Sequence, residues 1–265
     1  MRWRILIVFI FALTGAGCAA PPAVVETGTP DLGTLWVKHA AEYRALSLQV
    51  YQAATAALPR FVDDPDWSAI PGQTAPGLPP AVILDVDETV VSNVDFQLSF
   101  EPPFANWKME RWNREHAAAP VPGAAEFVAA ARAVGVTVFF VTNRPCEPEQ
   151  IAPGICEQKR TTLRDLAEAG IETDAAHLLL SKERGWNREK VTRREFIAKT
   201  HRVIMLFGDD LGDFLPCVRA KLYAPCTVPA TAISRRSMVD ASARFWGNGW
   251  YVLPNPMHGS WTSAM

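Results

Sequence analysis

The chain has 265 residues, of which 49% are hydrophobic and 20% are charged, so it can bury a full core in one domain of moderate size. Its net charge is −2 and it has no run of Lys or Arg, which argues against a nucleic-acid polymer as a partner. No segment beyond the N-terminus is apolar enough to cross a bilayer.

Residues 1–17 have the pattern of an export signal. MRWR supplies positive charge, ILIVFIFAL is a short apolar core, and TGAGC is a small-residue cleavage region that ends at Cys18. Cleavage before Cys18, with lipid added to its thiol, is the bacterial lipoprotein pattern and predicts an exported protein held to a membrane by its N-terminal lipid. Removal of Arg2 and Arg4 with the signal changes the net charge from −2 to −4. Residues 18–33, rich in Pro, Ala and Gly, are expected to form a tether.

The first element of the fold is a helix predicted over residues 34–58, with Thr34 near its start. Apolar side chains recur there at helical spacing, at Trp36, Ala40, Tyr43, Leu46, Val50 and Ala54. Residues 59–80 contain six prolines and two glycines and are predicted to form a loop.

The stretch AVILDVDETVVSN (81–93) predicts a buried strand that ends in acids. Its apolar residues 81–84 are typical of a strand covered on both faces in a parallel sheet, and such sheets bind ligands at the carboxyl ends of their strands. Asp85 and Asp87 follow directly, with Glu88 beside them. Two carboxylates at this spacing repel each other, and a divalent cation would remove the conflict. The alternative is a strand end whose acids face water.

Residues 94–120 are rich in aromatic side chains without strand alternation, which predicts a small helical cap over the carboxyl end of the sheet. Helices and strands then alternate regularly, which indicates an α/β fold with a doubly wound parallel sheet and right-handed crossovers. Helices are predicted over 123–134, 157–169 and 189–200, and strands over 136–141, 177–181 and 202–207.

Two further strands end in polar groups that suit a metal and a phosphate. Thr142 and Asn143 end one strand, and Asp209-Asp210-x-x-Asp213 ends the last. Carboxylate, carbonyl and water oxygens are the ligands that Mg²⁺ takes, so the acids at these strand ends predict a Mg²⁺ site. A phosphate bound there would contact the metal, the Thr142 hydroxyl, the amides after it, and a lysine.

The four cysteines beyond Cys18 allow three pairings. In one of these pairings, Cys146 joins Cys156 and Cys217 joins Cys226, so that each bridge closes a short loop. Disulfides are expected in an oxidising compartment. The competing zinc site is disfavoured because no pair has the C-x2-4-C spacing of such sites.

These motifs together resemble the haloacid dehalogenase superfamily of phosphohydrolases, and within it the bacterial class C acid phosphatases (subfamily IIIB), whose members include outer-membrane lipoproteins active on nucleotides. The resemblance runs from about Trp36 to Trp261, and the phosphatase domain is placed at 34–265 with its cap in 34–58 and 94–120. The motifs that carry it are W-x6-Y, ILDVDETVVSN, VPGAAEF, VFFVTNR, KVTRREFI, GDDLGDF and YVLPNPMHGSW.

The resemblance implies a role for each acid. Asp85 is the nucleophile, which forms an aspartyl-phosphate, and Asp87 is the general acid and base. Mg²⁺ is bound by Asp85, the backbone carbonyl of Asp87, and Asp209. Asp213 orients the lysine or supports the metal ligands, and it can also cap the helix after Gly212.

The resemblance also implies a substrate-binding and catalytic lysine, for which the sequence offers Lys182, Lys190 and Lys199. Lys190 begins a helix, and KVTRR matches the family's K-x-x-R; Lys182 follows a strand end directly and is the alternative. Thr142 is both catalytic and substrate-binding, and Asn143 and Arg144 are further substrate-binding candidates; for Arg144 the alternative is an ion pair with an acid.

Four positions depart from the family pattern. Val91 replaces a Leu, Phe96 replaces a Tyr, and Asp210 replaces an Asn or Thr and adds charge beside the metal. His258 stands where a pocket Tyr is usual, which leaves the nucleobase preference open.

The implied function is that of an exported, Mg²⁺-dependent acid phosphatase acting on small phosphomonoesters, nucleoside 5′-monophosphates above all, with an acidic pH optimum. An outer-membrane or periplasmic location in a Gram-negative bacterium and a homodimer are implied as well. The alternatives are a phosphotransferase that uses the same intermediate and a non-catalytic surface lipoprotein that serves as a binding module.

Overall fold

The computed structural model describes residues 31–99, 101–116, 118–147 and 155–265. The export signal and Cys18 lie outside the described residues and stay predictions. The α-helices in the described residues are α1 (Leu32–His39), α2 (Ala41–Asp63), α3 (Val94–Ser99), α4 (Asn106–Glu115), α5 (Ala124–Ala133), α6 (Glu157–Glu168), α7 (Val191–Ala198) and α8 (Ala232–Ala241). Short 3-10 helices in the described residues include η2 (Glu183–Gly185), η3 (Leu211–Asp213) and η4 (Ser260–Ala264). None of the helices in these ranges is both long enough and apolar enough to cross a membrane.

A five-stranded parallel sheet forms the centre of the molecule. Its strands lie in the order β5-β4-β1-β6-β7, and all four pairings are parallel. From the central β1 the chain builds outward on one side and then on the other, which confirms the predicted doubly wound α/β fold. The strands are β1 (Pro80–Leu84), β4 (Thr137–Pro145), β5 (Leu178–Ser181), β6 (Arg202–Gly208) and β7 (Trp250–Val252).

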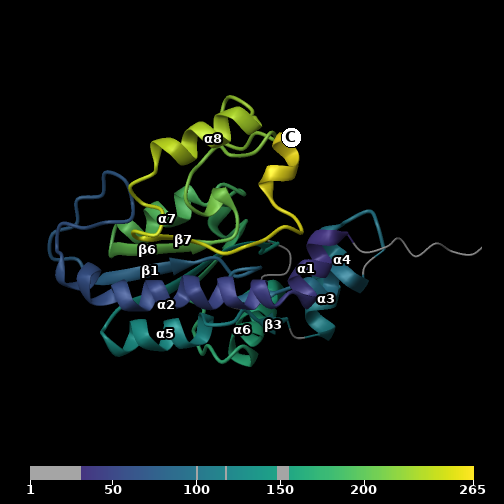
Figure 1. Ribbon diagram of the computed structural model, residues 1–265, viewed down its shortest axis with the longest axis horizontal. Helices are drawn as coiled ribbons and strands as arrows, with labels where there is room; N and C mark the ends of the chain where they lie inside the picture. Colours follow the sequence, from purple (N-terminus) through teal and green to yellow (C-terminus); the bar gives the residue numbers. More distant parts are fainter. Residues whose placement is uncertain (1–30, 100, 117, 148–154) are drawn as a thin grey trace, which may run out of the picture.

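Both faces of the central strand are buried, as its apolar run predicts. Val82 and Leu84 belong to one core cluster, with side chains of α2, α5 and α6, whereas Ala81 and Ile83 belong to a second cluster with Ile197 of α7. Figure 1 shows α2, α5 and α6 on one side of the sheet and α7 on the other. The acids that follow Leu84 therefore emerge from between two packed layers.

The predicted helix over 34–58 is two helices. Ala40 has an extended backbone (φ −76°, ψ 128°) and separates α1 from α2. The break lets α1 pack on α3 while α2 runs along the sheet and packs on α5. Asp31 caps α1 by accepting a hydrogen bond from the Thr34 amide, so the helix begins two residues earlier than predicted.

The second of these helices also ends later than predicted. It continues through Pro59 to Asp63, where a loop was expected. A proline inside a helix costs about 3 kcal/mol, and burial of Phe61 against Trp67, with ring centroids 4.9 Å apart, offsets this cost. Leu58 is buried in the same turn.

The apolar face predicted for this segment is only partly correct. Tyr43 and Ala54 are buried as expected, but Leu46 is 40% exposed. The buried face of α2 instead continues through Tyr51, whose ring stacks on Phe207 at the end of β6. The second half of the segment therefore packs against the sheet.

Small elements gather beyond the carboxyl end of β1, where α1, α3 and α4 lie together in Figure 1. A two-stranded antiparallel sheet, β2 (Val91–Ser92) with β3 (Ala119–Pro120), connects this region to the main body. The helices α3 and α4 agree with the helical character predicted for residues 94–120. The division of the chain into cap and core domains stays a prediction.

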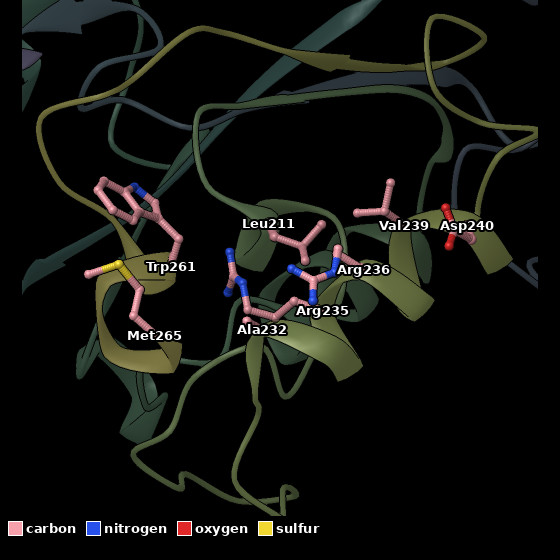
Figure 2. A pocket seen from close by; sticks show the side chains of 8 residues that line it. All are labelled: Leu211, Ala232, Arg235, Arg236, Val239, Asp240, Trp261 and Met265. Atoms are coloured by element: carbon pink, nitrogen blue, oxygen red, sulfur yellow. The ribbon is translucent and has the colours of Figure 1, made fainter.

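Two elements near the C-terminus were not predicted, namely α8 and β7. No residue of α8 is buried, so the helix lacks the apolar stripe by which a sequence reveals a packed helix. Between α8 and η4 lies a groove of about 440 Å³ (Figure 2), and the residues that line it include Leu211, Val239 and Trp261. None of the predicted site residues lines this groove.

Both predicted disulfides are present. Cys146 is bonded to Cys156, and Cys217 is bonded to Cys226. These four cysteines are therefore not available for the competing zinc site. The first bridge joins the end of β4 to the residue that precedes α6.

Truncation of two leucines in one helix tests the observed face of α2. We expect Leu58→Ala, at a side chain that is 2% exposed, to lower the free energy of unfolding by about 2–5 kcal/mol. The matched control Leu46→Ala, at a side chain that is 40% exposed, should change it by less than about 0.5 kcal/mol. Urea unfolding monitored by circular dichroism gives both values. Equal losses in the two variants would contradict the helix orientation described above.

Candidate active site

The centre of the site is a buried ion-pair cluster at the end of β1. The Lys190 ammonium lies 2.5 Å from Oδ1 of Asp85 and 2.6 Å from Oδ1 of Asp213. Lys190 immediately precedes α7, which packs against the sheet, and its side chain is almost completely buried. Three segments that are distant in sequence thus bring one cation between two acids.

A third carboxylate completes the cluster. Asp209 follows β6, the neighbour of β1, and one carboxylate oxygen each from Asp85, Asp209 and Asp213 lie within 4.8 Å of one another. Asn255 donates to Oδ2 of Asp209 at 2.7 Å, and the Thr89 hydroxyl donates to Oδ1 at 3.3 Å. Asp209 is therefore held in a fixed orientation by neutral donors.

The GDDLGD turn positions its acids through close backbone packing. A Cβ at Gly208 would lie 2.1 Å from Oδ2 of Asp213, so only glycine allows the carboxylate to fold back over the end of the strand. The same oxygen accepts from the Asp210 amide at 3.0 Å. With Oδ1 on Lys190 and Oδ2 on this amide, Asp213 is bound in the way expected of a group that orients the lysine.

Asp210 adds negative charge near Asp209, where it contributes to the raised pKa of that acid, and its side chain also has structural contacts. Its side chain accepts from the Gly212 amide at 2.8 Å and from the Ser260 hydroxyl at 2.8 Å, and it faces Arg219 at 3.6 Å. It caps η3 and holds the C-terminal segment in place. Asp210 is absent from the group of carboxylates that come together at Asp85.

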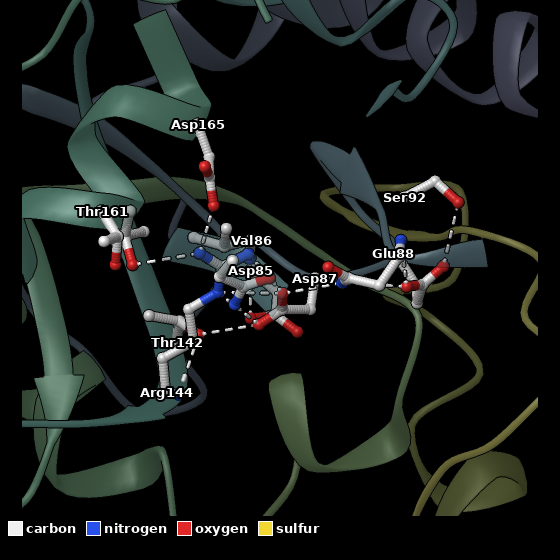
Figure 3. A network of polar contacts seen from close by, with 12 residues as sticks. Asp85, Val86, Asp87, Glu88, Ser92, Thr142, Arg144, Thr161 and Asp165 are labelled. Atoms are coloured by element: carbon white, nitrogen blue, oxygen red, sulfur yellow. Dashed lines mark hydrogen bonds and ion pairs between the residues drawn. The ribbon is translucent and has the colours of Figure 1, made fainter. Parts of the chain in front are cut away.

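The second acid of the motif, Asp87, is held by a separate network (Figure 3). Arg144 donates to it through Nη2 at 2.8 Å and through Nε at 3.0 Å, and the Thr142 hydroxyl donates at 3.2 Å. On the other side the Asn93 amide donates to Asp87 at 2.8 Å and to Glu88 at 3.0 Å. The two acids of D-x-D thus have different cations as partners.

The side chains predicted to bind substrate are themselves held by the protein. Arg144 is buried and also pairs with Asp165 of α6 at 2.6 Å. The side-chain oxygen Oδ1 of Asn143 accepts from Arg193 at 2.6 Å, and Arg193 also donates to the backbone oxygen of Thr142. These contacts fix the loop that follows β4.

The alternative lysines lie elsewhere. Lys182 forms an ion pair with Glu147, and its side chain is 52% exposed. Lys199 follows the far end of α7 as its C-cap. Lys190 is the lysine that the structure brings to Asp85.

The acids of the cluster have unusual protonation equilibria. Burial is the main reason that the pKa of Asp85 rises to about 7; Lys190 opposes the rise, and Asp213 and Asp87 add to it. Burial, together with the charges of Asp213 and Asp85, raises the pKa of Asp209 well above its usual value. Too much negative charge is therefore concentrated here for Lys190 alone to balance.

The ion pairs of Arg144 and Lys190 favour the charged forms of Asp87 and of Lys190 itself. Burial raises the pKa of Asp87, but the charge and hydrogen bonds of Arg144 outweigh it, so that the pKa lies below its usual value. Burial lowers the pKa of Lys190, but Asp213 and Asp85 outweigh it, and the pKa is raised. Lys190 is therefore a permanent cation at this site.

The residues present fit a divalent cation. Hard divalent ions take oxygen ligands, and the cluster supplies carboxylates whose mutual repulsion such an ion would remove. Because Lys190 and a backbone amide hold the two oxygens of Asp213, the cluster oxygens best suited to the ion belong to Asp85 and Asp209.

A buried acid and a histidine lie beside this network. Glu88 is buried with a left-handed backbone (φ 58°), and His258 Nε2 lies 3.9 Å from its Oε1. Burial raises the pKa of Glu88, and His258 opposes the rise. Burial is the main reason that the pKa of the Tyr43 phenol is raised, and the negative charge of Glu88 adds to the rise. His258 is therefore the side chain that faces the buried Glu88 carboxylate.

Several site residues were not singled out by residue-type reasoning. Asn93, Arg193 and Asn255 belong to the motifs ILDVDETVVSN, KVTRREFI and YVLPNPMHGSW, so motif membership was a usable signal. Asp165 carried no such signal, because it lies in a helix that was predicted only from its length and position.

The fold and the site together define an α/β enzyme with an acidic, lysine-paired centre at the carboxyl ends of a parallel sheet. The family model for the HAD superfamily, subfamily IIIB (acid phosphatase), matches residues 32–261, and the chain belongs to this family. It is an acid phosphatase, and divalent metal ions are general in the superfamily. This membership rules against the non-catalytic binding module.

Two solved structures support this assignment. The chain is 26% identical to the class C acid phosphatase from Bacillus anthracis, with a TM-score of 0.67. The match covers 88% of the present chain and 86% of the Bacillus anthracis chain. A second structure of the Bacillus anthracis enzyme, with tungstate bound, matches with a TM-score of 0.69 at 26% identity over the same shares.

The raised pKa of Asp85 predicts how stability depends on pH when metal is removed. Its pKa is about 7 in the folded chain and about 3.9 in an unfolded one, so between these values the folded state retains a proton that the unfolded state releases. Stability from this group is complete below about pH 4 and is lost as the pH rises through 7. In EDTA, the free energy of unfolding should therefore decline over this range.

Urea unfolding of the wild type and of Asp85→Asn in EDTA isolates this contribution. The decline should be smaller in the variant, because other titrating groups are common to both proteins. Identical pH slopes in the two proteins would show that Asp85 titrates normally.

Proposed function

We propose that the chain hydrolyses phosphomonoesters in a Mg²⁺-dependent reaction that passes through an aspartyl-phosphate on Asp85. The observation that carries the proposal is the contact of Lys190 with both Asp85 and Asp213, next to Asp209. Lys190 fixes the nucleophile and supplies positive charge where a phosphoryl group would add negative charge.

Asp85 is suited to attack because one of its oxygens remains available. Among the described residues, the contacts of Lys190 and of the Val86 amide both go to Oδ1. Oδ2 is then the oxygen that forms a bond to phosphorus while the bond from phosphorus to the ester oxygen breaks. The Thr142 hydroxyl and the amides that follow it bind the phosphoryl oxygens.

Asp87 serves as the proton donor and acceptor. It gives its proton to the leaving alkoxide, and its carboxylate then takes a proton from the water that hydrolyses the aspartyl-phosphate. The first step needs Asp87 protonated, and Arg144 keeps its pKa low. Attack also needs Asp85 ionised, so the acidic pH optimum that we propose requires the bound cation to lower the pKa of Asp85 from its metal-free value of about 7.

A Mg²⁺ ion held by Asp85, Asp209 and the backbone carbonyl of Asp87 supplies charge neutralisation for the phosphoryl group. The tungstate reported in the Bacillus anthracis structure supports an oxyanion site in this family. The raised pKa of Asp85 and of Asp209 supports a cation between them.

Nucleoside 5′-monophosphates are the substrates we favour. This preference rests on the family resemblance, since the class C acid phosphatases include outer-membrane lipoproteins active on nucleotides. A phosphotransferase would use the same aspartyl-phosphate and would differ only in the acceptor. Product analysis with an added alcohol separates the two activities, and transfer that exceeds hydrolysis would favour the second.

We also propose export and lipid attachment at Cys18, in an outer-membrane or periplasmic location, and a homodimer; these rest on the signal pattern and on the family resemblance. Cys18→Ser should release the protein from the membrane fraction of its host. Retention of the variant there would contradict the anchor, and a monomeric mass by light scattering would contradict the dimer.

Activity towards p-nitrophenyl phosphate and a panel of nucleoside monophosphates tests the catalytic proposal. We expect EDTA to abolish turnover and Mg²⁺ to restore it, and Asp85→Asn to reduce kcat by about a thousandfold or more. Lys190→Met should cause a severe loss, whereas the matched control Lys182→Met should retain activity because this lysine lies at the surface. Full activity of Asp85→Asn would remove the proposed mechanism.

A further inference from the structure

Helix α6 presents an unusual buried face to the site. A helix that packs against a sheet normally buries apolar side chains there, because buried polar groups cost free energy unless they are paired. Only Leu166 of the buried side chains of α6 is apolar; the others are Gln158, Lys159, Thr161, Thr162 and Asp165. The buried polar side chains of α6 must therefore be compensated by hydrogen bonds or ion pairs with their neighbours.

The most buried charge on this face is Asp165, whose side chain is fully inaccessible. Its Oδ2 accepts from Nη1 of Arg144 at 2.6 Å, and the Thr162 hydroxyl lies 3.2 Å from the same nitrogen. The remaining edge of the guanidinium, Nε and Nη2, faces Asp87. Arg144 is thus held along two edges by two carboxylates (Figure 3).

The other oxygen of Asp165 connects this pair to the cap. Arg164 donates to Oδ1 of Asp165 at 3.1 Å, and its guanidinium also donates to backbone oxygens at the end of α4, including that of Arg114 at 3.0 Å. The Cys146–Cys156 disulfide ties the strand that carries Arg144 to the start of the helix that carries Asp165. Both ends of the Arg144–Asp165 pair are therefore fixed in the fold.

We propose that Asp165 is a positioning residue for proton donation: by fixing the Arg144 guanidinium it fixes the carboxyl of Asp87 for the leaving group. This inference rests on the proposed function, because it takes Asp87 to be the proton donor. Fixed placement matters here, since a proton donor must lie within hydrogen-bond reach of the ester oxygen at the moment that the bond to phosphorus breaks. Removal of Asp165 would leave one edge of Arg144 unpaired and free to turn away from Asp87.

The dependence of the rate on the leaving group separates this role from a structural one. A p-nitrophenolate leaving group needs little help from a proton, whereas the alkoxide of an alkyl phosphate or a nucleoside 5′-monophosphate needs it fully. We expect Asp165→Asn, assayed as the full-length enzyme with Mg²⁺, to lower kcat for the alkyl ester by about tenfold more than kcat for p-nitrophenyl phosphate. KM should change little for either substrate.

Two further variants make the result interpretable. Glu157→Gln makes the same acid-to-amide change in α6 at an exposed side chain that pairs with Arg160, and should leave both rates unchanged. Thr162→Val removes the hydroxyl next to Nη1 while keeping the shape of the side chain, and should give a smaller loss with the same preference. Thermal unfolding of Asp165→Asn checks that this variant folds. If it folds poorly, Thr162→Val tests the proposal in its place.

The rates of Asp165→Asn and Asp87→Asn with the two esters distinguish failure of the positioning role from failure of the proposed acid–base role. Equal losses for the two esters in folded Asp165→Asn, or no loss at all, would overturn the positioning role. Asp87→Asn must itself show the leaving-group preference; if it does and Asp165→Asn does not, only the present inference fails. If Asp87→Asn hydrolyses both esters at reduced but equal rates, the acid–base assignment within the proposed function fails instead.

Discussion

The arrangement of this site depends on one constraint: several carboxylates are concentrated at the buried end of a sheet, and each needs a compensating charge. Burial of an unpaired carboxylate is strongly unfavourable. Lys190 supplies one compensation, between Asp85 and Asp213. The raised pKa of Asp209 shows that this compensation is incomplete. The remaining charge is what makes the cluster a place for a divalent cation.

A second cation divides the two acids of the D-x-D motif. Arg144 pairs with Asp87 and with Asp165, and takes no part in the contacts of Asp85. The pKa of Asp85 is raised and that of Asp87 is lowered, although the two residues lie two positions apart on one strand end. In the metal-free chain this order is the reverse of the one that the proposed roles need, because a nucleophile must be ionised and a proton donor protonated. A divalent cation that lowers the pKa of Asp85 is therefore part of the proposed mechanism. The doubly wound sheet gives each acid its own environment by bringing different strands and helices to it.

Most of the cluster could be predicted from the sequence because parallel strands end at the same edge of a sheet. That rule places Asp85, Thr142 and Asp209 together, and the family motif selects Lys190 over Lys182. The partners of Arg144 could not be predicted, since Asp165 lies on a helix whose buried face is polar and therefore shows no apolar period. Local geometry was also missed where packing overrides propensity, as at Ala40, where a helix breaks, and at Pro59, where one continues.

The central claim is that Asp85 forms a covalent bond to phosphorus. Acid quenching of the enzyme during turnover, followed by borohydride reduction and mass spectrometry, tests this directly, because borohydride converts an aspartyl-phosphate to homoserine. The account predicts homoserine at position 85 only when a phosphomonoester and Mg²⁺ are present. Turnover at the normal rate with Asp85 unmodified, or with the modification at another residue, would contradict it.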